Sequence, residues 1–139
     1  MRTAIDTDIL SSLWGGETSA SRVSATLDAA SNAGSLVICA MVFVEVQGYR
    51  GVTRDFLERF LESTRVNVDW GLDRPIWQMA AERFGTYADR SRRLGLCQPT
   101  NVPADFIIAA HATLHADRLI TLDQRRYCAD FSELNIVEL

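Results

Sequence analysis

Two aspartates lie one residue apart at the end of the first apolar run of the chain, in the stretch AIDTDIL. A strand over these residues would place Asp6 where the strand leaves its sheet. Three more acids adjoin apolar segments: Glu45 in MVFVEV, Asp105 in PADFIIAA and Asp123 directly after LIT. Each acid alone has an ordinary explanation as a helix cap, a turn residue or a partner of a helix dipole. Gathered in one place, they would repel one another unless a cation lay among them.

The elements that must position these acids alternate between strands and helices along the chain. We expect strands at TAIDT, SLVICA, RVNVDW, RLITLD and NIVEL, and helices at residues 19–33, 41–49, 53–63, 75–90 and 103–116. The Gly- and Pro-containing stretch RLGLCQPTNVP is expected to be a loop. No repeat or linker divides the chain, so we expect one domain over residues 1–139. The alternation predicts an α/β fold with a mainly parallel sheet and helices on its faces.

This topology predicts that all four acids lie on one edge of the sheet. Crossover helices run antiparallel to parallel strands, so the carboxyl edge collects the ends of strands and the starts of helices. Asp6 and Asp123 follow the first and fourth strands, Glu45 lies just over one turn into a helix, and Asp105 lies in the first turn of another. In open α/β sheets, ligands bind at this edge.

The chemistry of such a cluster is that of a hard divalent cation. Carboxylate oxygens with no converging His or Cys favour Mg²⁺ or Mn²⁺. An ion of this kind lowers the pKa of a bound water and stabilises a leaving oxygen, which suits hydrolysis of phosphodiesters. Asp8 and Thr121 flank the four acids and are candidates to orient them, directly or through water.

The order of four motifs, IDTDIL, FVEV, PADFIIAAHA and LITLDQRRY, resembles the PIN domain, whose single-domain members include the VapC-type toxins. The resemblance covers essentially the whole chain. It implies a flavodoxin-like three-layer α/β/α fold and a magnesium-dependent endoribonuclease with Asp6, Glu45, Asp105 and Asp123 as catalytic metal ligands and Thr121 supporting the last. It also implies a homodimer and an antitoxin whose tail blocks the acidic groove. The family usually has Asn two residues after its first Asp, where this chain has Asp8.

A basic region precedes the loop that leads to Asp105. It consists of Arg83, Arg90, Arg92 and Arg93 and is a candidate rim for the RNA backbone. A solvated helix end with ordinary arginines explains it equally well.

Composition excludes several other classes of protein. Hydrophobic residues make up 47% and charged residues 23%, as in soluble globular proteins. Every basic residue of the chain is Arg, so a P-loop and lysine Schiff-base chemistry are excluded. The net charge of −4 argues against a general affinity for nucleic acid but permits a local basic patch. No run is long enough to span a membrane and no apolar signal segment begins the chain, so we expect a cytoplasmic protein with no membrane association.

The two histidines, His111 and His115, have the i, i+4 spacing that can hold zinc. No Glu-containing zincin signature accompanies them, which favours two incidental histidines on a helix.

Two alternative functions remain open. AIDTDI also matches the start of haloacid-dehalogenase-like phosphatases, in which Asp6 would be the nucleophile and Asp8 the acid/base. That family generally also uses a Lys, or sometimes an Arg, for the phosphoryl charge; this chain has no Lys, and the family gives Glu45 and Asp105 no role. The other alternative is a non-catalytic module that binds RNA or protein, although the intact set of four acids argues against it.

Overall fold

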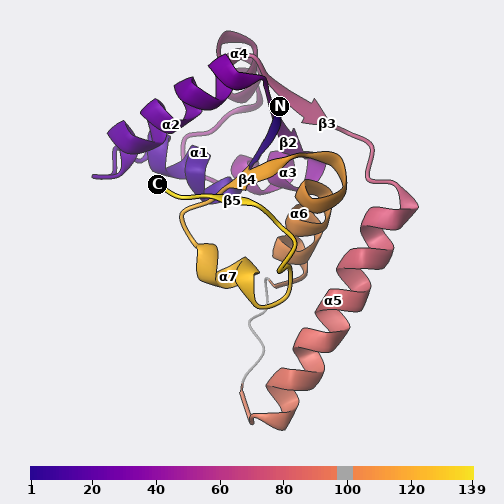
Figure 1. Ribbon diagram of the computed structural model, residues 1–139. Coiled ribbons are helices and arrows are strands. Elements are labelled where there is room, and N and C mark those ends of the chain that lie inside the picture. The colour runs from indigo at the N-terminus through magenta and orange to yellow at the C-terminus, as the bar shows by residue number, and fades with distance from the viewer. Residues whose placement is uncertain (97–101) are drawn as a thin grey trace.

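A computed structural model describes residues 1–96 and 102–139 of the chain as a three-layer α/β/α fold around a parallel sheet (Figure 1). The strands are β1 Arg2–Ile5, β2 Ser35–Cys39, β3 Val66–Asp69, β4 Arg118–Ile120 and β5 Ile136–Val137. The helices are α1 Thr7–Trp14, α2 Ala20–Ala33, α3 Ala40–Gln47, α4 Arg54–Thr64, α5 Arg74–Arg93, α6 Val102–His115 and α7 Gln124–Cys128. Part of the predicted loop RLGLCQPTNVP, residues 97–101, lies outside the described residues.

The sheet has the strand order β3-β2-β1-β4-β5, and every neighbouring pair is parallel. The predicted α/β class with a mainly parallel sheet is therefore confirmed. The chain enters at the central strand β1, which pairs with β2 on one side and with β4 on the other. As a result, the carboxyl ends of β1 and β4 adjoin, and they bring Asp6 beside the segment that follows Ile120: the backbone N–H of Asp6 donates to the carbonyl of Ile120 at 3.0 Å.

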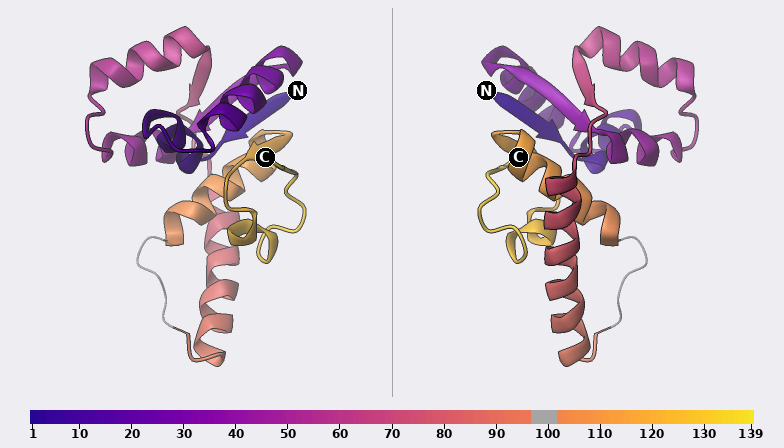
Figure 2. Two further views of the ribbon diagram at one scale, coloured as in Figure 1. Left: turned by 90° about the vertical axis from the view of Figure 1, so that its left-hand side faces the viewer. Right: turned by 90° about the vertical axis from the view of Figure 1, so that its right-hand side faces the viewer.

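The helices form two layers that are joined to the sheet by apolar packing. Helices α1, α2 and α4 lie together on one side, where Trp14 of α1 makes edge-to-face contacts with Phe56 and Phe60 of α4. Helices α5 and α6 pack against each other on the other side, and Figure 2 shows the C-terminal half of α5 extending beyond the sheet. Ile5, Ile38 and Leu119 of the three central strands are completely buried between these layers. None of the helices in the described part of the chain combines the length and the apolar character needed to cross a membrane.

The sequence did not predict the short helix α7 or the helix α1, and α1 bears directly on Asp6. It begins directly after β1, where the side chain of Asp6 caps it by accepting a hydrogen bond from the backbone N–H of Thr7 at 2.7 Å. Ile9 and Leu10 then turn fully inward. Asp6 is thus both the last residue before the helix and its N-cap, which fixes the direction of the carboxylate.

Candidate active site

The carboxylate of Asp6 lies at the centre of a buried hydrogen-bond network. Besides Thr7, it accepts hydrogen bonds at Oδ2 from the hydroxyl of Thr121 at 2.9 Å and from the hydroxyl of Tyr127 at 2.7 Å. Asp6, Thr121 and Tyr127 are each about 1% exposed. Burial, followed by the charge of Asp6, raises the pKa of Tyr127, so this phenol remains a hydrogen-bond donor across the physiological range. The buried carboxylate of Asp6 thus accepts hydrogen bonds from three donors.

Asp8 lies on the first turn of α1 and connects that helix to the segment after β4. It accepts hydrogen bonds from the backbone N–H of Leu122 at 3.2 Å and from the hydroxyl of Thr121 at 3.2 Å. The single hydroxyl proton of Thr121 is therefore shared between Asp6 and Asp8. Burial and the neighbouring charge of Asp6 raise the pKa of Asp8 to about 6. Asp8 and Thr121 therefore lie beside Asp6, and their role in orienting metal ligands stays a prediction.

Glu45 projects from α3, just over one turn from its start, as the sequence predicted. Its Oε1 atom is buried and makes no hydrogen bond of ordinary length to the described residues, although the hydroxyl of Thr7 is near enough to this side chain to oppose the rise in its pKa. Burial, together with the charges of Asp105 and Asp6, raises the pKa of Glu45 to about 7. Burying a carboxylate oxygen without a partner raises the free energy of the folded state, and a bound cation would offset this increase.

Asp105 and Asp123 share one guanidinium. Asp105 lies in the first turn of α6, and Asp123 is the N-cap of α7. Arg126 places Nη1 3.3 Å from Asp105 Oδ1 and Nη2 3.5 Å from Asp123 Oδ2. Burial raises the pKa of Asp105 to about 6 against the opposing effect of Arg126, with further increases from Asp6 and Asp123.

The electrostatic effects show that the acids lie near one another. The charge of Asp6 raises the pKa of Asp8, Glu45 and Asp105, and the charge of Asp123 raises that of Asp105 as well. The four acids are more widely spaced than the ligands of a closed metal site. Within the described residues, no three of them bring carboxylate oxygens within 4.8 Å of one another. Arg126 lies between two of them instead. The all-oxygen donor set and the free Glu45 Oε1 fit Mg²⁺ or Mn²⁺, and the role of the four acids as ligands stays a prediction.

Sequence reasoning missed two residues of this site, Arg126 and Tyr127. Both lie on the short helix α7, which Asp123 caps through a hydrogen bond from the backbone N–H of Arg126 at 3.3 Å. A signal was present, since an Asp followed three residues later by Arg in DQRR places the two side chains on the same face of one helical turn.

The four arginines of the predicted RNA rim lie on α5 and differ in their surroundings. Arg90 contacts both carboxylate oxygens of Asp130 at 3.0 and 3.1 Å, and Arg83 pairs with Glu133 and with the carbonyl of Asp130. Among the described residues, Arg92 and Arg93 pair only with the exposed Asp89 on their own helix. The first two therefore hold the C-terminal segment against α5, whereas the side chains of Arg92 and Arg93 are largely exposed.

The sequence matches the family model described as PIN domain over residues 3–133. A comparison with curated proteins found no significant match.

Among solved structures, the fold is similar to that in the VapBC2 structure from Rickettsia felis bound to a DNA fragment from its promoter, with TM-score 0.64, 16% identity and coverage of 100% of this chain and 99% of that one. It is also similar to VapBC-1 from nontypeable Haemophilus influenzae, with TM-score 0.64, 21% identity and coverage of 99% and 98%. FitAcB from Neisseria gonorrhoeae gives TM-score 0.63, 19% identity and coverage of 98% and 96%. At these identities, the likeness shows the fold.

Proposed function

Because this chain belongs to the PIN domain family, we propose that it is a metal-dependent endoribonuclease and the toxin of a type II toxin–antitoxin pair. Two of the similar solved structures are VapBC complexes, which supports the pairing with an antitoxin. The same proposal includes a homodimer, an antitoxin tail that covers the acid cluster, and a cytoplasmic location.

The observation that carries the nuclease proposal is the buried, unpartnered Oε1 of Glu45 beside Asp105 and Asp6. Asp6, Glu45, Asp105 and Asp123 would hold Mg²⁺ or Mn²⁺. When bound, such an ion supplies an acidified water and stabilises the leaving oxygen of a phosphodiester. Arg126 balances Asp105 and Asp123 only in part, and a cation would offset the repulsion that remains among the four carboxylates.

The remaining residues of the site orient these ligands. Thr121 and Tyr127 fix the carboxylate of Asp6 through hydrogen bonds at 2.9 and 2.7 Å. Asp8 holds α1 to the turn after β4, so Asp6 and Asp123 keep their relative positions. Arg126 is partly exposed, and its guanidinium is suited to pair with a phosphate of bound RNA once metal ions balance Asp105 and Asp123.

The test is RNA cleavage by partner-free protein, with a pool of structured RNAs in Mn²⁺ or in EDTA. We expect cuts that require metal and that fall at least about a hundredfold in Asp105→Asn, because that variant loses one metal ligand. Asp28→Asn, which changes an exposed carboxylate on α2, is the matched control and should cleave like the wild type.

A parallel assay with p-nitrophenyl phosphate separates the alternatives. Phosphatase turnover that survives Asp105→Asn would overturn the nuclease proposal and make Asp6 a nucleophile. Metal-independent RNA binding without cleavage would indicate a binding module.

A further inference from the structure

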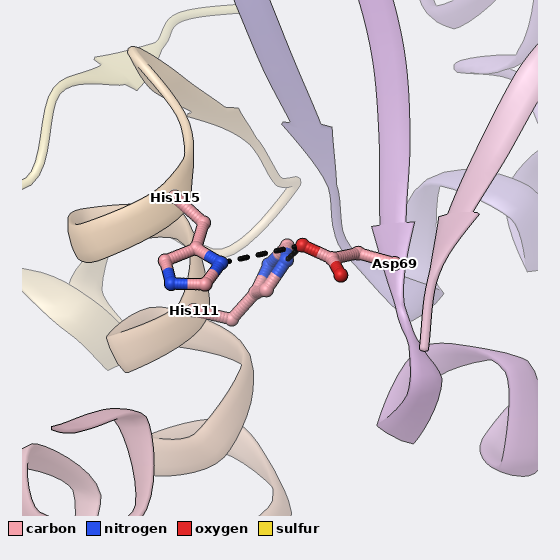
Figure 3. Close-up of side chains that lie close together, drawn as sticks. All are labelled: Asp69, His111 and His115. Carbon is pink, nitrogen blue, oxygen red and sulfur yellow. Dashed lines mark hydrogen bonds and ion pairs between the residues drawn. The ribbon is translucent and has the colours of Figure 1, made fainter. Parts of the chain in front are cut away.

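The two histidines of the chain lie one turn apart on α6, and both approach the same carboxylate (Figure 3). Asp69, the last residue of β3, places Oδ2 3.0 Å from Nε2 of His111 and 3.3 Å from Nδ1 of His115. In the part of the chain that the structure describes, these three side chains form the one group of possible metal ligands whose donor atoms all lie within 4.8 Å of one another. None of them belongs to the acid cluster.

We propose that Asp69, His111 and His115 bind a transition-metal ion, with Zn²⁺ as the probe, and that this ion ties α6 to the end of β3. Two imidazole nitrogens and one carboxylate oxygen are a donor set that suits Zn²⁺ and neighbouring metals far better than Mg²⁺. Ligands about 2.0–2.2 Å from a tetrahedral zinc are about 3.3–3.5 Å from one another. The observed contacts of 3.0 and 3.3 Å to Asp69 are close to that separation, so a small outward movement would admit the ion.

The surroundings of the three ligands resemble the outer shell of a metal site. The far nitrogen of His115, Nε2, lies 3.3 Å from Oδ2 of Asp73, which is the pairing that orients a metal-bound imidazole. The other oxygen of Asp69 accepts a hydrogen bond from the backbone N–H of Gly71 at 3.2 Å. Both partners belong to the short connection between β3 and α5, so one loop positions two of the ligands. His111 is completely buried, and this burial lowers its pKa and favours the neutral imidazole that a metal requires.

Arg2 is the group that competes with the ion. Its Nη2 lies 3.0 Å from the same Oδ2 of Asp69 and supplies positive charge there. The side chain of Arg2 is 44% exposed, so it can turn into solvent when a metal takes its place. A hydrogen-bonded cluster of Arg2, Asp69 and the two histidines, with no affinity for metal, is the competing explanation that the experiment must separate.

The histidines of this site and Asp105 of the acid cluster lie on the same helix, α6. Helix α6 carries Asp105 in its first turn and His111 and His115 toward its other end. Six residues of helix separate Asp105 from His111, about 9 Å along the axis at 1.5 Å per residue. An ion that fixes the C-terminal part of α6 to β3 therefore fixes the helix that presents Asp105.

The test is a Zn²⁺ titration of the full chain in millimolar Mg²⁺, followed through the imidazole NMR resonances. Because the chain has only two histidines, these resonances report on this site alone. We expect one zinc ion per chain to shift the resonances of both rings and to raise the melting temperature. The affinity should fall at least about tenfold in His115→Gln and in Asp69→Asn. His115 is partly exposed, so its variant should keep the fold, which circular dichroism checks.

Two matched controls make the result specific. Asp105→Asn alters the acid cluster and Cys128→Ser removes an exposed thiol, and both should bind Zn²⁺ as the wild type does. Unmoved imidazole resonances at stoichiometric zinc, or unchanged affinity in folded His115→Gln and Asp69→Asn, would overturn the proposal and leave the hydrogen-bonded cluster. Loss of RNA cleavage in Asp105→Asn with zinc binding intact would separate this site from the proposed nuclease.

Discussion

At the scale of single residues, the hydroxyl of Tyr127 donates a hydrogen bond to the buried carboxylate of Asp6 at 2.7 Å. Tyr127→Phe removes that donor and leaves a buried charge with one hydrogen bond fewer. We expect a loss of about 1–3 kcal/mol in the free energy of unfolding, the usual cost of a buried charge-assisted hydrogen bond. Urea denaturation of the metal-free protein measures it.

The control for this variant is Tyr49→Phe, which changes an exposed tyrosine. It should alter the free energy of unfolding by less than about 0.5 kcal/mol. Equal effects of the two substitutions would show that the hydroxyl of Tyr127 does not support Asp6.

Glu45 gives a prediction for pH dependence. Its pKa in the folded chain is about 7, above the ordinary 4.5, so the folded state holds the proton more tightly than the unfolded state does. The charged form of Glu45 therefore lowers stability above pH 7, and this penalty disappears as the pH falls from about 7 toward 4.5. In EDTA, Glu45→Gln should stabilise the protein at pH 8 by about 1–2 kcal/mol, a value reduced for the partial exposure of the side chain.

The same substitution should lose most of that advantage at pH 5.5, where the wild-type carboxyl is largely protonated. Urea denaturation of both proteins at the two pH values tests the sign, and taking the difference cancels the titration of groups that both share. A constant difference at pH 8 and pH 5.5 would show that Glu45 titrates near its ordinary pKa.

At the scale of elements, α5 holds the C-terminal segment through its arginines. Arg90 forms two contacts with Asp130, whose side chain is only 6% exposed. Arg90→Ala leaves the buried carboxylate of Asp130 without this ion pair, and we expect a loss of about 1–3 kcal/mol in the free energy of unfolding. Arg92→Ala, which breaks only an exposed pair with Asp89, should cost less than about 0.5 kcal/mol. Thermal or urea denaturation of the two variants compares them directly.

The arginines of the predicted RNA rim therefore fall into two groups: Arg83 and Arg90 hold the C-terminal segment, whereas Arg92 and Arg93 are exposed candidates for binding RNA. Arg92→Glu combined with Arg93→Glu should weaken RNA binding by at least about tenfold without a change in melting temperature, since within the described residues these side chains pair only with the exposed Asp89. Filter binding at low salt to an Asp105→Asn background, which does not cleave, measures the affinity. Unchanged affinity would remove this end of α5 from the RNA interface.

The strands and long helices could be predicted from local patterns. A short continuous apolar run such as SLVIC indicates a buried strand, and apolar residues at helical spacing, as in DFLERFLE, indicate an amphipathic helix. Helix α1 was missed because its start coincides with the end of β1, so that one residue, Asp6, ends one element and caps the next. The places of Asp6, Glu45, Asp105 and Asp123 followed from topology alone, since parallel strands and crossover helices meet at one edge.

Contacts that depend on how the elements pack could not be predicted from the sequence. Asp69 lies 42 residues from His111, and nothing in RVNVDW indicates that its last acid faces α6. The donation from Tyr127 to Asp6 likewise spans 121 residues and depends on β1 and β4 being neighbours in the sheet.

At the scale of the whole molecule, the proposed homodimer needs an apolar surface, and one lies beside the edge strand β3. Val44 of α3 and Trp70, directly after β3, are 65% and 64% exposed, and Phe43 packs edge-to-face on Trp70. Large exposed apolar side chains gathered on one face mark interaction surfaces, and Trp70 packed on Phe43 beside a sheet edge is a candidate for one. We expect light scattering of the partner-free chain to give twice the chain mass of 15.5 kDa.

Val44→Ser combined with Trp70→Ser should convert that dimer to a monomer, because it removes the apolar area that association would bury. Leu94→Ser is the control: Leu94 is equally exposed but lies at the far end of α5, so its variant should remain dimeric. A monomeric wild type would contradict the homodimer itself, whereas a dimer that persists in the double variant would place the interface on another face. Neither substitution replaces a member of the acid cluster, so RNA cleavage by the monomeric variant also reports whether one chain carries a complete active site.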